Sequence, residues 1–317
     1  MSKIRVAVVG AGQFGRNHMR VVHQSGGAEL AAVVDTDPTR AAEAAREFEC
    51  AAVDLADLAG RVDAAIVAVP TVAHCAVGCA LLEAGIDVLV EKPIAPDLPS
   101  ARRLIDTARA HSRILQVGHL ERFNPGVAAL RGAAGLPLFF EVHRMSVFTP
   151  RSLDIDVVLD LMIHDLDIVL NLVGRRPEEI RAAGISILSP KVDIANVRLA
   201  FPGGCVANLT ASRVSTERVR KLRLFQPRQY ISLDYARQEA AVFEVGGNRQ
   251  IGFRMLPAEK AEPLSLELES FFEAVETRRQ PLVTGEDAYA ALEVALAILD
   301  KIEEHSRQVE QSMAAWK

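Results

Sequence analysis

The fold of this 317-residue chain is decided by residues 4–15, which read IRVAVVGAGQFG. The first six residues form a short apolar run that predicts a buried β-strand. The rest follows the pattern G-x-G-x-x-G and opens a predicted helix that runs to about Gln24. Glycines at this spacing permit a tight turn, a close approach of backbone to a pyrophosphate, and close packing of helix on strand. We therefore expect a dinucleotide to bind at this loop, through Gly10, Gly12, Gln13, Phe14 and Gly15.

A carboxylate at the end of the next predicted strand supports this interpretation. Residues 29–34 are expected to form a strand that ends in Asp35, at roughly the 20-residue offset typical of dinucleotide-binding domains. A carboxylate at this point binds the adenosine ribose hydroxyls and repels a 2′-phosphate. The sequence therefore favours NAD over NADP, with a solvated turn acid as the alternative for Asp35.

Strands and helices continue to alternate through the first 120 residues. Strands are expected at 62–69, 88–90 and 114–117, with helices at 73–82 and 100–110 between them. This alternation predicts a doubly wound parallel sheet, in which ligands bind outside the carboxyl ends of the strands. The residues expected at that edge are Gly10, Asp35, Pro70, Glu91 and Gly118.

The strand at 88–90 is followed by Glu91, Lys92 and Pro93. A lysine at a strand end can be partly desolvated and directed at one oxygen of a ligand, and the proline restricts the local backbone. A surface lysine paired with Glu91 is the alternative, and it is the simpler one when this segment is considered alone.

The second half of the chain has a different pattern. Longer strands that often alternate apolar and polar residues are expected, and they predict a mostly antiparallel sheet with one solvated face. We expect them at 138–147, 180–188, 195–201, 205–214, 219–225 and 230–234, with helices at 264–277 and 287–306. We place a dinucleotide-binding domain at 1–120 and a second domain at 121–317, to which the family resemblance described below assigns substrate binding and oligomer contacts.

One apolar helix is expected at 157–173. Its polar members Asp160, His164, Asp167 and Asn171 fall on a single stripe, as on any amphipathic surface helix. In the functional interpretation the stripe faces a ligand, because histidine exchanges protons near neutral pH and a nearby carboxylate orients it. The other histidines on helices or loops, at 18, 23, 111 and 305, are expected at the surface.

Composition excludes several classes of protein. The net charge of −5 provides no basic field for nucleic acid or an anionic membrane, and no run approaches the ~20 apolar residues of a transmembrane helix. The N-terminus enters a strand directly, without the apolar region of a signal peptide. The four cysteines form no CxxC motif, so we expect free thiols, no metal site and a cytoplasmic protein.

Taken together, these motifs resemble the Gfo/Idh/MocA oxidoreductases over nearly the full chain. The matching segments are the glycine loop, Asp35, Pro70–His74, Glu91–Pro93, Asp160-x-x-x-His164 and 281–287. The resemblance implies a Rossmann domain followed by an α/β domain with an open, largely antiparallel sheet. It also implies a nicotinamide cofactor, a sugar or polyol substrate, and a homodimer or homotetramer formed through that sheet.

A closer resemblance is to the branch of this family that oxidises carbon 3 of UDP-N-acetylglucosamine. It is carried by residues 118–125 (GHLERFNP), by 212–215 (SRVS), and by the basic residues that precede 230–235. The glycines often found before the Asp-x-x-x-His helix are replaced at 154–158, which leaves the size of the substrate open.

The resemblance suggests a role for each candidate. His164 would accept the hydroxyl proton, Lys92 would stabilise the developing alkoxide, and Asp160 would orient the substrate or His164. Glu91 would support Lys92 or contact the nicotinamide ribose, with further dinucleotide contacts from Pro70, Thr71 and His74. Candidates for binding the substrate, including its diphosphate, are Arg122, Asn124, Arg213 and Lys221.

Other functions remain open from the sequence. The same residues would serve an inositol or free-sugar dehydrogenase, or a hydrolase that uses NAD transiently. A non-catalytic NAD-sensing regulator is expected to lack the lysine or the histidine, and this chain has both. A methyltransferase would share the first glycine loop alone.

Overall fold

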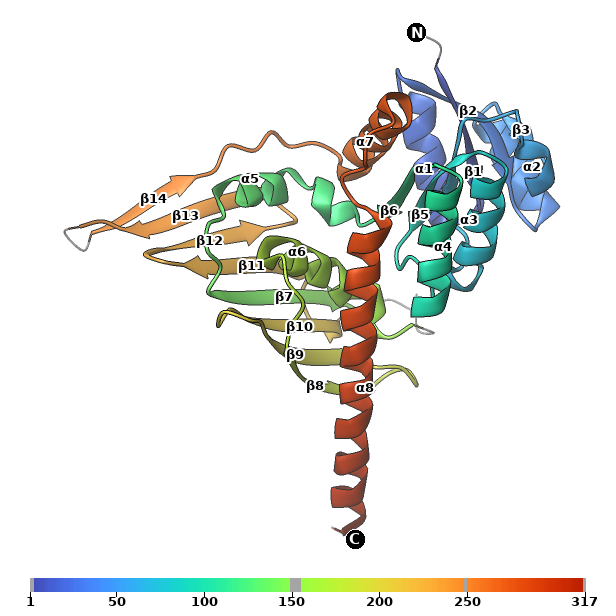
Figure 1. Cartoon of the computed structure of the whole chain (residues 1–317). Helices are drawn as coiled ribbons and strands as arrows, with labels where there is room; N and C mark the ends of the chain where they lie inside the picture. The colour runs from blue at the N-terminus through green and yellow to red at the C-terminus, as the bar shows by residue number, and fades with distance from the viewer. Residues whose placement is uncertain (1–2, 149–154, 248–249, 316–317) are drawn as a thin grey trace. The chain divides into compact units, whose positions relative to one another are not determined.

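The computed structural model describes residues 3–148, 155–247 and 250–315 (Figure 1). By its internal contacts the chain divides into two compact units. Unit 1 comprises residues 1–120 and 262–289, and unit 2 comprises residues 121–261 and 290–317. The first division falls after Leu120, but 121–317 is not one body, because the segment 262–289 packs with the N-terminal sheet.

Unit 1 is built on a six-stranded sheet of order β3-β2-β1-β4-β5-β6, in which every neighbouring pair is parallel. Its strands are β1 (Ile4–Val9), β2 (Ala28–Val34), β3 (Ala51–Ala52), β4 (Ala64–Val67), β5 (Asp87–Glu91) and β6 (Leu115–Gly118). The order reverses beside β1, which is the topology of the predicted doubly wound sheet.

The helices of unit 1 are α1 (Gln13–Gln24), α2 (Pro38–Glu47), α3 (His74–Glu83), α4 (Leu98–Ala110) and α7 (Pro263–Thr277). One apolar cluster joins α1, α2 and α7 to β1, β2, β4 and β5, while α3 packs against α4. Helix α7 buries Leu268 and Phe271 in that cluster. This burial is the physical reason why the segment 262–289 belongs to unit 1.

Helix starts in unit 1 follow local capping rules. Asp37 accepts hydrogen bonds from Thr39 N–H (2.9 Å) and Arg40 N–H (3.3 Å), and Pro38 occupies the first turn of α2. Asp97 caps α4 in the same way through Ser100 N–H (2.7 Å). Such caps satisfy backbone donors that a helix start leaves unpaired.

Unit 2 is built on an eight-stranded sheet of order β14-β13-β12-β11-β7-β10-β9-β8. Its strands are β7 (Phe139–Val147), β8 (Glu179–Ile185), β9 (Ile194–Ala200), β10 (Val206–Ser215), β11 (Val219–Gln226), β12 (Gln229–Asp234), β13 (Glu239–Val245) and β14 (Ile251–Met255). All neighbours are antiparallel except β7 and β10, so the predicted mostly antiparallel sheet is confirmed.

Helices cover one face of this sheet. They are α5 (Pro125–Ala133), α6 (Ile163–Val173) and the part of α8 (Gly285–Ala315) that follows Tyr289, and they share one apolar cluster with alternate residues of the strands. The opposite face carries no helix of the described residues (Figure 1). Among those residues no helix combines the length and the apolar character needed to cross a bilayer.

Candidate functional site

The glycine loop of unit 1 leaves no room for side chains at two of its three glycines. Gly10 has φ +105°, and a Cβ atom there would lie 2.5 Å from the carbonyl oxygen of Ala68. A Cβ atom on Gly15 would lie 1.7 Å from the carbonyl oxygen of Gly10. Glycine is therefore required at both positions, one for the turn and one for close packing of α1 on the strand.

Gly12 differs, because no atom of the described residues lies within 4 Å of the Cβ it would carry. It is the N-cap of α1, whose first turn contains no acidic residue, and Phe14 in that turn is 63% exposed. The N-terminus of α1 therefore presents backbone N–H groups and a positive dipole end to open space. This geometry, with Gln13 at the first helical position, fits the pyrophosphate of a dinucleotide.

Asp35 lies beside the loop, where β2 ends. Its carboxylate accepts hydrogen bonds from Ala11 N–H (2.7 Å) and Asp37 N–H (2.8 Å). Arg40, 52% exposed, lies 3.3 Å from the same carboxylate. The position of Asp35 suits a ribose contact, and the carboxylate also holds the glycine loop in place. The adjacent cation was not predicted from the sequence.

His74 does not line the edge as expected. It is 1% exposed, and its Nδ1 and Nε2 atoms lie 2.9 Å from the carbonyl oxygens of Pro93 and Val69. Burial lowers the pKa of His74, although both carbonyls favour its cation. The ring therefore links the ends of β4 and β5, while Pro70 is exposed and Thr71 half-buried at the start of the following turn.

Glu91 and Lys92 end β5, and the Lys92–Pro93 peptide bond is cis. His18 Nε2 donates to Glu91 Oε1 (2.7 Å), and the Lys92 backbone N–H donates to Glu91 Oε2 (3.2 Å). The expectation that His18 lies at the surface is wrong, because the residue is 1% exposed. Its position was recognisable: Gly15, His18, Met19 and Val22 share the apolar face of α1.

In unit 2, Asp160 and His164 lie at a break in helix geometry. Asp160 is in a π-helical turn, η4 (Val158–Met162), His164 is in the first turn of α6, and both are half-buried. A π-turn adds a residue per turn, so Asp160 is offset from the predicted regular stripe, whereas His164, Asp167 and Asn171 keep α-helical spacing in α6. Asp167 is enclosed rather than presented to a ligand: it is 2% exposed and paired with Arg122.

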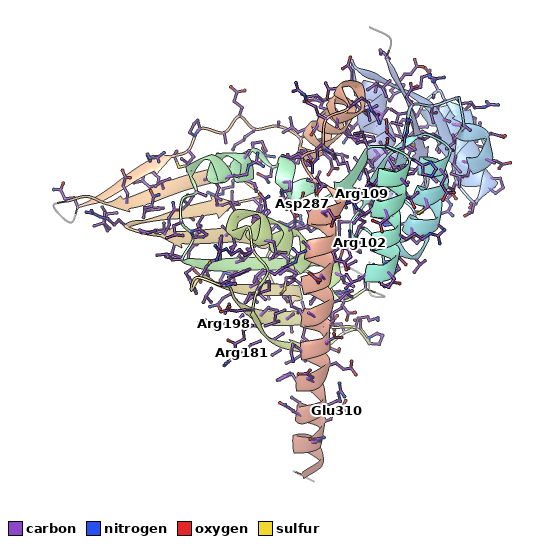
Figure 2. All side chains as sticks on the ribbon, in the orientation of Figure 1. Arg102, Arg109, Arg181, Arg198, Asp287 and Glu310 are labelled. Atoms are coloured by element: carbon purple, nitrogen blue, oxygen red, sulfur yellow. The ribbon has the colours of Figure 1, made fainter. Side chains whose placement is uncertain are left out.

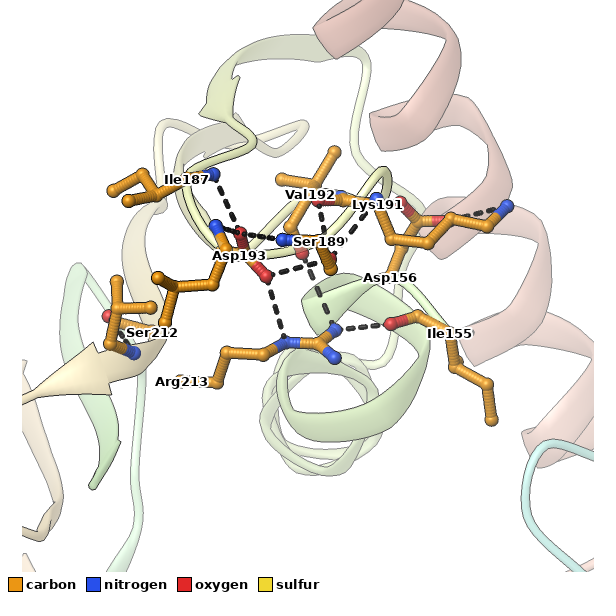
Figure 3. Close-up of polar contacts among 11 residues, drawn as sticks. Ile155, Asp156, Ile187, Ser189, Lys191, Val192, Asp193, Ser212 and Arg213 are labelled. Atoms are coloured by element: carbon orange, nitrogen blue, oxygen red, sulfur yellow. Dashed lines mark hydrogen bonds and ion pairs between the residues drawn. The ribbon is translucent and has the colours of Figure 1, made fainter. Parts of the chain in front are cut away.

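Arg213 supports the segment that leads into this break (Figure 3). Its guanidinium lies 3.6 Å from Asp193 and donates to the carbonyl oxygens of Ile155 and Val192. The side chain is buried. These contacts favour a structural role for Arg213 over contact with a diphosphate. The sequence departure at 154–158 is described from Ile155 onward, and its first residue lies outside the described residues.

The other candidates for substrate binding also have structural contacts. Arg122 forms two hydrogen bonds with Asp167 (2.6 and 2.9 Å), and Asn124 caps α5 through Gly126 N–H (3.0 Å). Lys221 is exposed on the sheet face opposite the one that packs against α6, because its neighbour Leu222 occupies the core. The geometry therefore does not bring Lys221 to Asp160 and His164.

A buried polar network in unit 2 was not predicted. Arg144 donates to both carboxylate oxygens of Asp165 (2.7 and 2.9 Å) and to Glu121 (2.9 Å). Burial opposes the charge, but Asp165 and Glu121 hold the pKa of Arg144 well above its usual value. The ring of Tyr235 lies under the guanidinium at 4.9 Å. This network fixes the start of α6 to the central strand β7 and to the segment before α5.

Comparison with known proteins agrees with these features. Residues 4–119 match the family model of the oxidoreductases with an NAD-binding Rossmann fold, and residues 132–230 match the GFO/IDH/MocA C-terminal domain. Within the chain, the Rossmann match includes the glycine loop, Asp35 and Lys92.

The chain is similar to proteins of known activity over nearly its full length. It is 36% identical to UDP-N-acetylglucosamine 3-dehydrogenase of Acidithiobacillus ferrooxidans, covering 96% of this chain and 98% of that protein. A solved structure of that enzyme has a TM-score of 0.90 at 35% identity, covering 96% of this chain and 99% of the other. Inositol 2-dehydrogenase of Rhizobium meliloti is 25% identical, covering 96% and 98% of the two chains. This chain therefore belongs to the Gfo/Idh/MocA oxidoreductase family.

Proposed function

We propose that this protein is an NAD-dependent dehydrogenase that oxidises carbon 3 of UDP-N-acetylglucosamine or a related UDP-sugar. The observation that carries the substrate assignment is the 36% identity to an enzyme with that activity, which extends through both units. The geometry of the glycine loop supports the cofactor, because Gly12 leaves the start of α1 accessible to a pyrophosphate.

The proposed reaction assigns one task to each polar group. NAD, when bound, supplies a hydride acceptor at its nicotinamide ring. Lys92 places positive charge at the substrate oxygen as its proton leaves, and His164 accepts that proton. Asp160 orients His164 or the substrate. Glu91, held by His18 and by the Lys92 backbone, keeps the end of β5 in one conformation.

For the choice between the two nicotinamide cofactors, we propose NAD. The Asp35 carboxylate would repel the 2′-phosphate of NADP. Arg40 favours NADP instead, because a guanidinium attracts a phosphate. It lies 3.3 Å from the Asp35 carboxylate and is half exposed. We expect Asp35→Ser to narrow the preference for NAD by leaving Arg40 available to a phosphate, with the ratio of kcat/KM for the two cofactors as the measurement. Arg16→Ala, in α1, is the control for a change in surface charge.

NADH formation against a panel of alcohols tests the function. We expect absorbance at the nicotinamide band to rise with UDP-N-acetylglucosamine, and a 3-keto sugar nucleotide to be found by mass spectrometry and NMR. The panel includes the uronate of that sugar, myo-inositol and free hexoses. Absence of turnover with every UDP-sugar would overturn the substrate assignment and leave the family unchanged.

Oxidation of an inositol is the second candidate. Inositol 2-dehydrogenase 4 of Saccharopolyspora erythraea is 36% identical to this chain, but the match covers only 58% of it. This shorter match, together with the lower identity of 25% in the full-length match to inositol 2-dehydrogenase of Rhizobium meliloti, favours the sugar nucleotide. Turnover of myo-inositol with a higher kcat/KM than any UDP-sugar would reverse this order.

We propose that the open face of the unit 2 sheet joins subunits into a homodimer or homotetramer. Five aromatic rings form a stripe across it, with successive centroids 4.5–5.7 Å apart: Phe139, Phe225, Tyr230, Phe243 and Phe253. Phe253 is 61% exposed and the other four rings are half-buried, and a row of aromatic groups accessible to solvent is typical of an interface. At the other end of this sheet, Arg181 and Arg198 extend from β8 and β9 (Figure 2).

Light scattering tests the oligomer. We expect Phe253→Glu to shift the protein toward monomer, because the carboxylate would be buried at the interface. The control Arg181→Ala should leave the mass of the oligomer unchanged. A monomeric wild-type protein at micromolar concentration would overturn this proposal.

A cytoplasmic location is also proposed. All four cysteines are free thiols in the structure, and burial raises the pKa of three of them, Cys50, Cys75 and Cys205, to about 11. Thiols that are protonated at neutral pH are poor nucleophiles. Free thiols that form no disulfide are typical of a reducing compartment. Activity retained in fractions of disrupted cells that contain cytoplasmic markers would agree with this location, and activity confined to other fractions would contradict it.

A further inference from the structure

Three buried polar side chains and the half-buried Glu91 lie near the end of β5 in unit 1. They come from four elements: His18 from α1, Glu91 from β5, Gln116 from β6 and Glu267 from α7. His18, Gln116 and Glu267 are at most 1% exposed. Strand alternation places Glu91 on the same sheet face as Leu89, which packs in the cluster with α1 and α7.

Hydrogen bonds satisfy only part of this group. Glu91 receives one bond from His18 and one from the Lys92 backbone, and Gln116 Nε2 donates to the backbone oxygen of Glu267 (3.1 Å). Gly118 makes room for the Glu91 carboxylate, because a Cβ atom there would lie 3.1 Å from Glu91 Oε2. The Glu91 carboxylate is therefore fixed on both oxygens.

Among the described residues, several buried atoms of this group have no hydrogen-bond partner. They are both carboxyl oxygens of Glu267, Oε1 of Gln116 and Nδ1 of His18. An ionised carboxylate without a donor is costly in such a place, and a second negative charge nearby increases the cost. Glu91 is that second charge. Two carboxylates that interact in this way titrate as a coupled pair, so the first proton binds to the oxygen atoms where the negative charge is least stabilised.

We propose that Glu267 is a neutral carboxylic acid in the native protein, and that Glu267 and His18 are positioning residues that keep the negative charge on Glu91 beside Lys92. The positioning part of this inference rests on the proposed hydride-transfer function, and the protonation of Glu267 does not. The neutral acid leaves one net negative charge in the group. That charge then remains on the Glu91 carboxylate, which accepts hydrogen bonds from His18 and from the Lys92 backbone N–H.

The charged neighbours are consistent with this assignment. Burial and the charge of Glu91 both raise the pKa of Glu267 well above its usual value. Burial opposes the charge of Glu91, but the bond from His18 and the cation of Lys92 lower its pKa. The remaining titratable neighbour of Glu91 is His74 of α3, whose cation it favours. The proton of the pair therefore belongs on Glu267.

Thermal unfolding of the cofactor-free protein between pH 5 and pH 8 tests the protonation of Glu267. In the unfolded chain this group ionises near pH 4.3, so the wild-type protein loses stability as the pH rises toward the raised native pKa. Glu267→Gln removes that loss. We expect the melting temperature of Glu267→Gln minus that of wild type to increase by about 3 °C or more across this range.

Glu269→Gln is the matched control, since Glu269 is exposed on the same helix. Its difference from wild type should stay constant with pH. A constant difference for Glu267→Gln as well would overturn the proposal, because an ionised or solvated Glu267 has no proton to lose. We expect the infrared spectrum of the wild-type protein to contain a band from a protonated carboxyl group, and we expect Glu267→Gln to lack this band. A wild-type spectrum without the band would also overturn the proposal.

The positioning role is tested by kinetics. We expect His18→Ala to lower kcat on the order of tenfold or more with little change in the Kd for NAD, because misplacing a catalytic group has effects of this size. His18→Gln retains an N–H donor and should recover part of kcat. Wild-type kcat in His18→Ala would overturn the role. Absence of turnover in wild type would instead count against the proposed function, while the unfolding experiment would still decide the state of Glu267.

Discussion

The polar edge of the unit 1 sheet and the polar residues of unit 2 differ in what surrounds them. At the edge of unit 1, Gly12 faces open space and Pro70 is exposed. In unit 2, Arg122, Arg144 and Asp165 are at most 5% exposed and are held in bidentate ion pairs. Enclosure by the fold therefore distinguishes the open edge of unit 1 from the paired charges of unit 2.

The difference shows how binding residues are distinguished from structural ones. A parallel sheet brings its strand ends to one edge, whatever the side chains are. Charged residues on an antiparallel sheet have no such common edge, and they interact mainly with the residues opposite them on neighbouring strands. Asp160 and His164 are half-buried polar residues of unit 2 that lie in and just after the π-turn, and such turns are frequent at functional sites.

The largest expected effect is on catalysis. Lys92→Ala and His164→Ala should each lower kcat by about 10²–10⁴, because each removes a group that acts on the reacting proton or charge. The Kd for NAD should change little in His164→Ala. If both residues act on the same alcohol, the fold decrease of kcat in the double variant should be smaller than the product of the two single-variant decreases.

Steady-state kinetics and calorimetric titration with NAD measure these effects. Lys260→Ala, an exposed lysine paired with Glu239, is the control for loss of a lysine. If His164→Ala were as active as wild type, His164 would not be the base, and it would belong with the structural residues of unit 2.

The second expected effect is on stability in unit 2. Arg122→Leu should lower the free energy of unfolding by about 3–5 kcal/mol, because Asp167 would remain buried without a partner. Lys221→Ala should change it by no more than about 0.5 kcal/mol, since this lysine is exposed. Denaturant titration measures both.

A compensating variant sharpens this prediction. Replacing Arg122 and Asp167 together by leucine should recover much of the loss, because no buried charge remains. If Arg122→Leu were as stable as wild type and instead raised the KM for a UDP-sugar, Arg122 would be a substrate contact after all.

The third expected effect separates two glycines of one loop. Gly15→Ala should lower the free energy of unfolding by about 3 kcal/mol, because its Cβ would overlap a backbone carbonyl and force the backbone to move. Gly12→Ala should leave stability within about 1 kcal/mol of wild type. It should nevertheless raise the Kd for NAD, since a methyl group would enter the space proposed for the pyrophosphate.

Thermal unfolding and NAD titration distinguish these two outcomes. Unchanged NAD affinity in Gly12→Ala would contradict the proposed position of the pyrophosphate. Unchanged stability in Gly15→Ala would contradict the packing of α1 against Gly10.

The smallest expected effect depends on pH. Asp193 is buried, which raises its pKa, but hydrogen bonds from the backbone N–H groups of Leu188 and Ile187 lower the pKa below its usual value. A carboxylate with a lowered native pKa stabilises the fold above its unfolded value of about 3.9, and this contribution is lost as the pH falls through the native value.

Asp193→Asn should therefore lower the free energy of unfolding by about 1–2 kcal/mol at pH 7, and less as the pH falls below about 4. Denaturant titration at several pH values is the measurement, with the exposed residue change Asp57→Asn as control. If the loss of unfolding free energy in Asp193→Asn did not depend on pH, the charge of Asp193 would contribute nothing to stability, although Asp193 also faces Arg213.

Local sequence was sufficient for much of the fold. The predicted bounds of β1 and α1 agree with the structure, as does the antiparallel character of the second sheet. Three strands were missed: β3 has two residues, β13 begins with Glu239 and two alanines, and β14 is short and contains Gly252. Such segments have weak strand propensity, and pairing with neighbours decides them.

The candidate site divides in the same way. Spacing after a strand was enough to predict Gly10, Gly12, Gly15 and Asp35, because these residues act through the local turn. His74 and Arg213 were selected by residue type at suitable positions, and that criterion cannot tell which groups the folded chain will enclose. The burial of Glu267 depends on α7 packing onto a sheet that lies about 150 residues earlier in the chain.

The sequence by itself determined the glycine turn, the alternation of strands and helices, and the family, because short-range patterns encode these properties. Only the tertiary structure decided which charges are enclosed: Arg122 with Asp167, His18 with Glu91, and Glu267 without a partner among the described residues. The physical reason is that the free energy of an ionisable group depends on solvent and on neighbours distant in sequence, and folding alone brings these together.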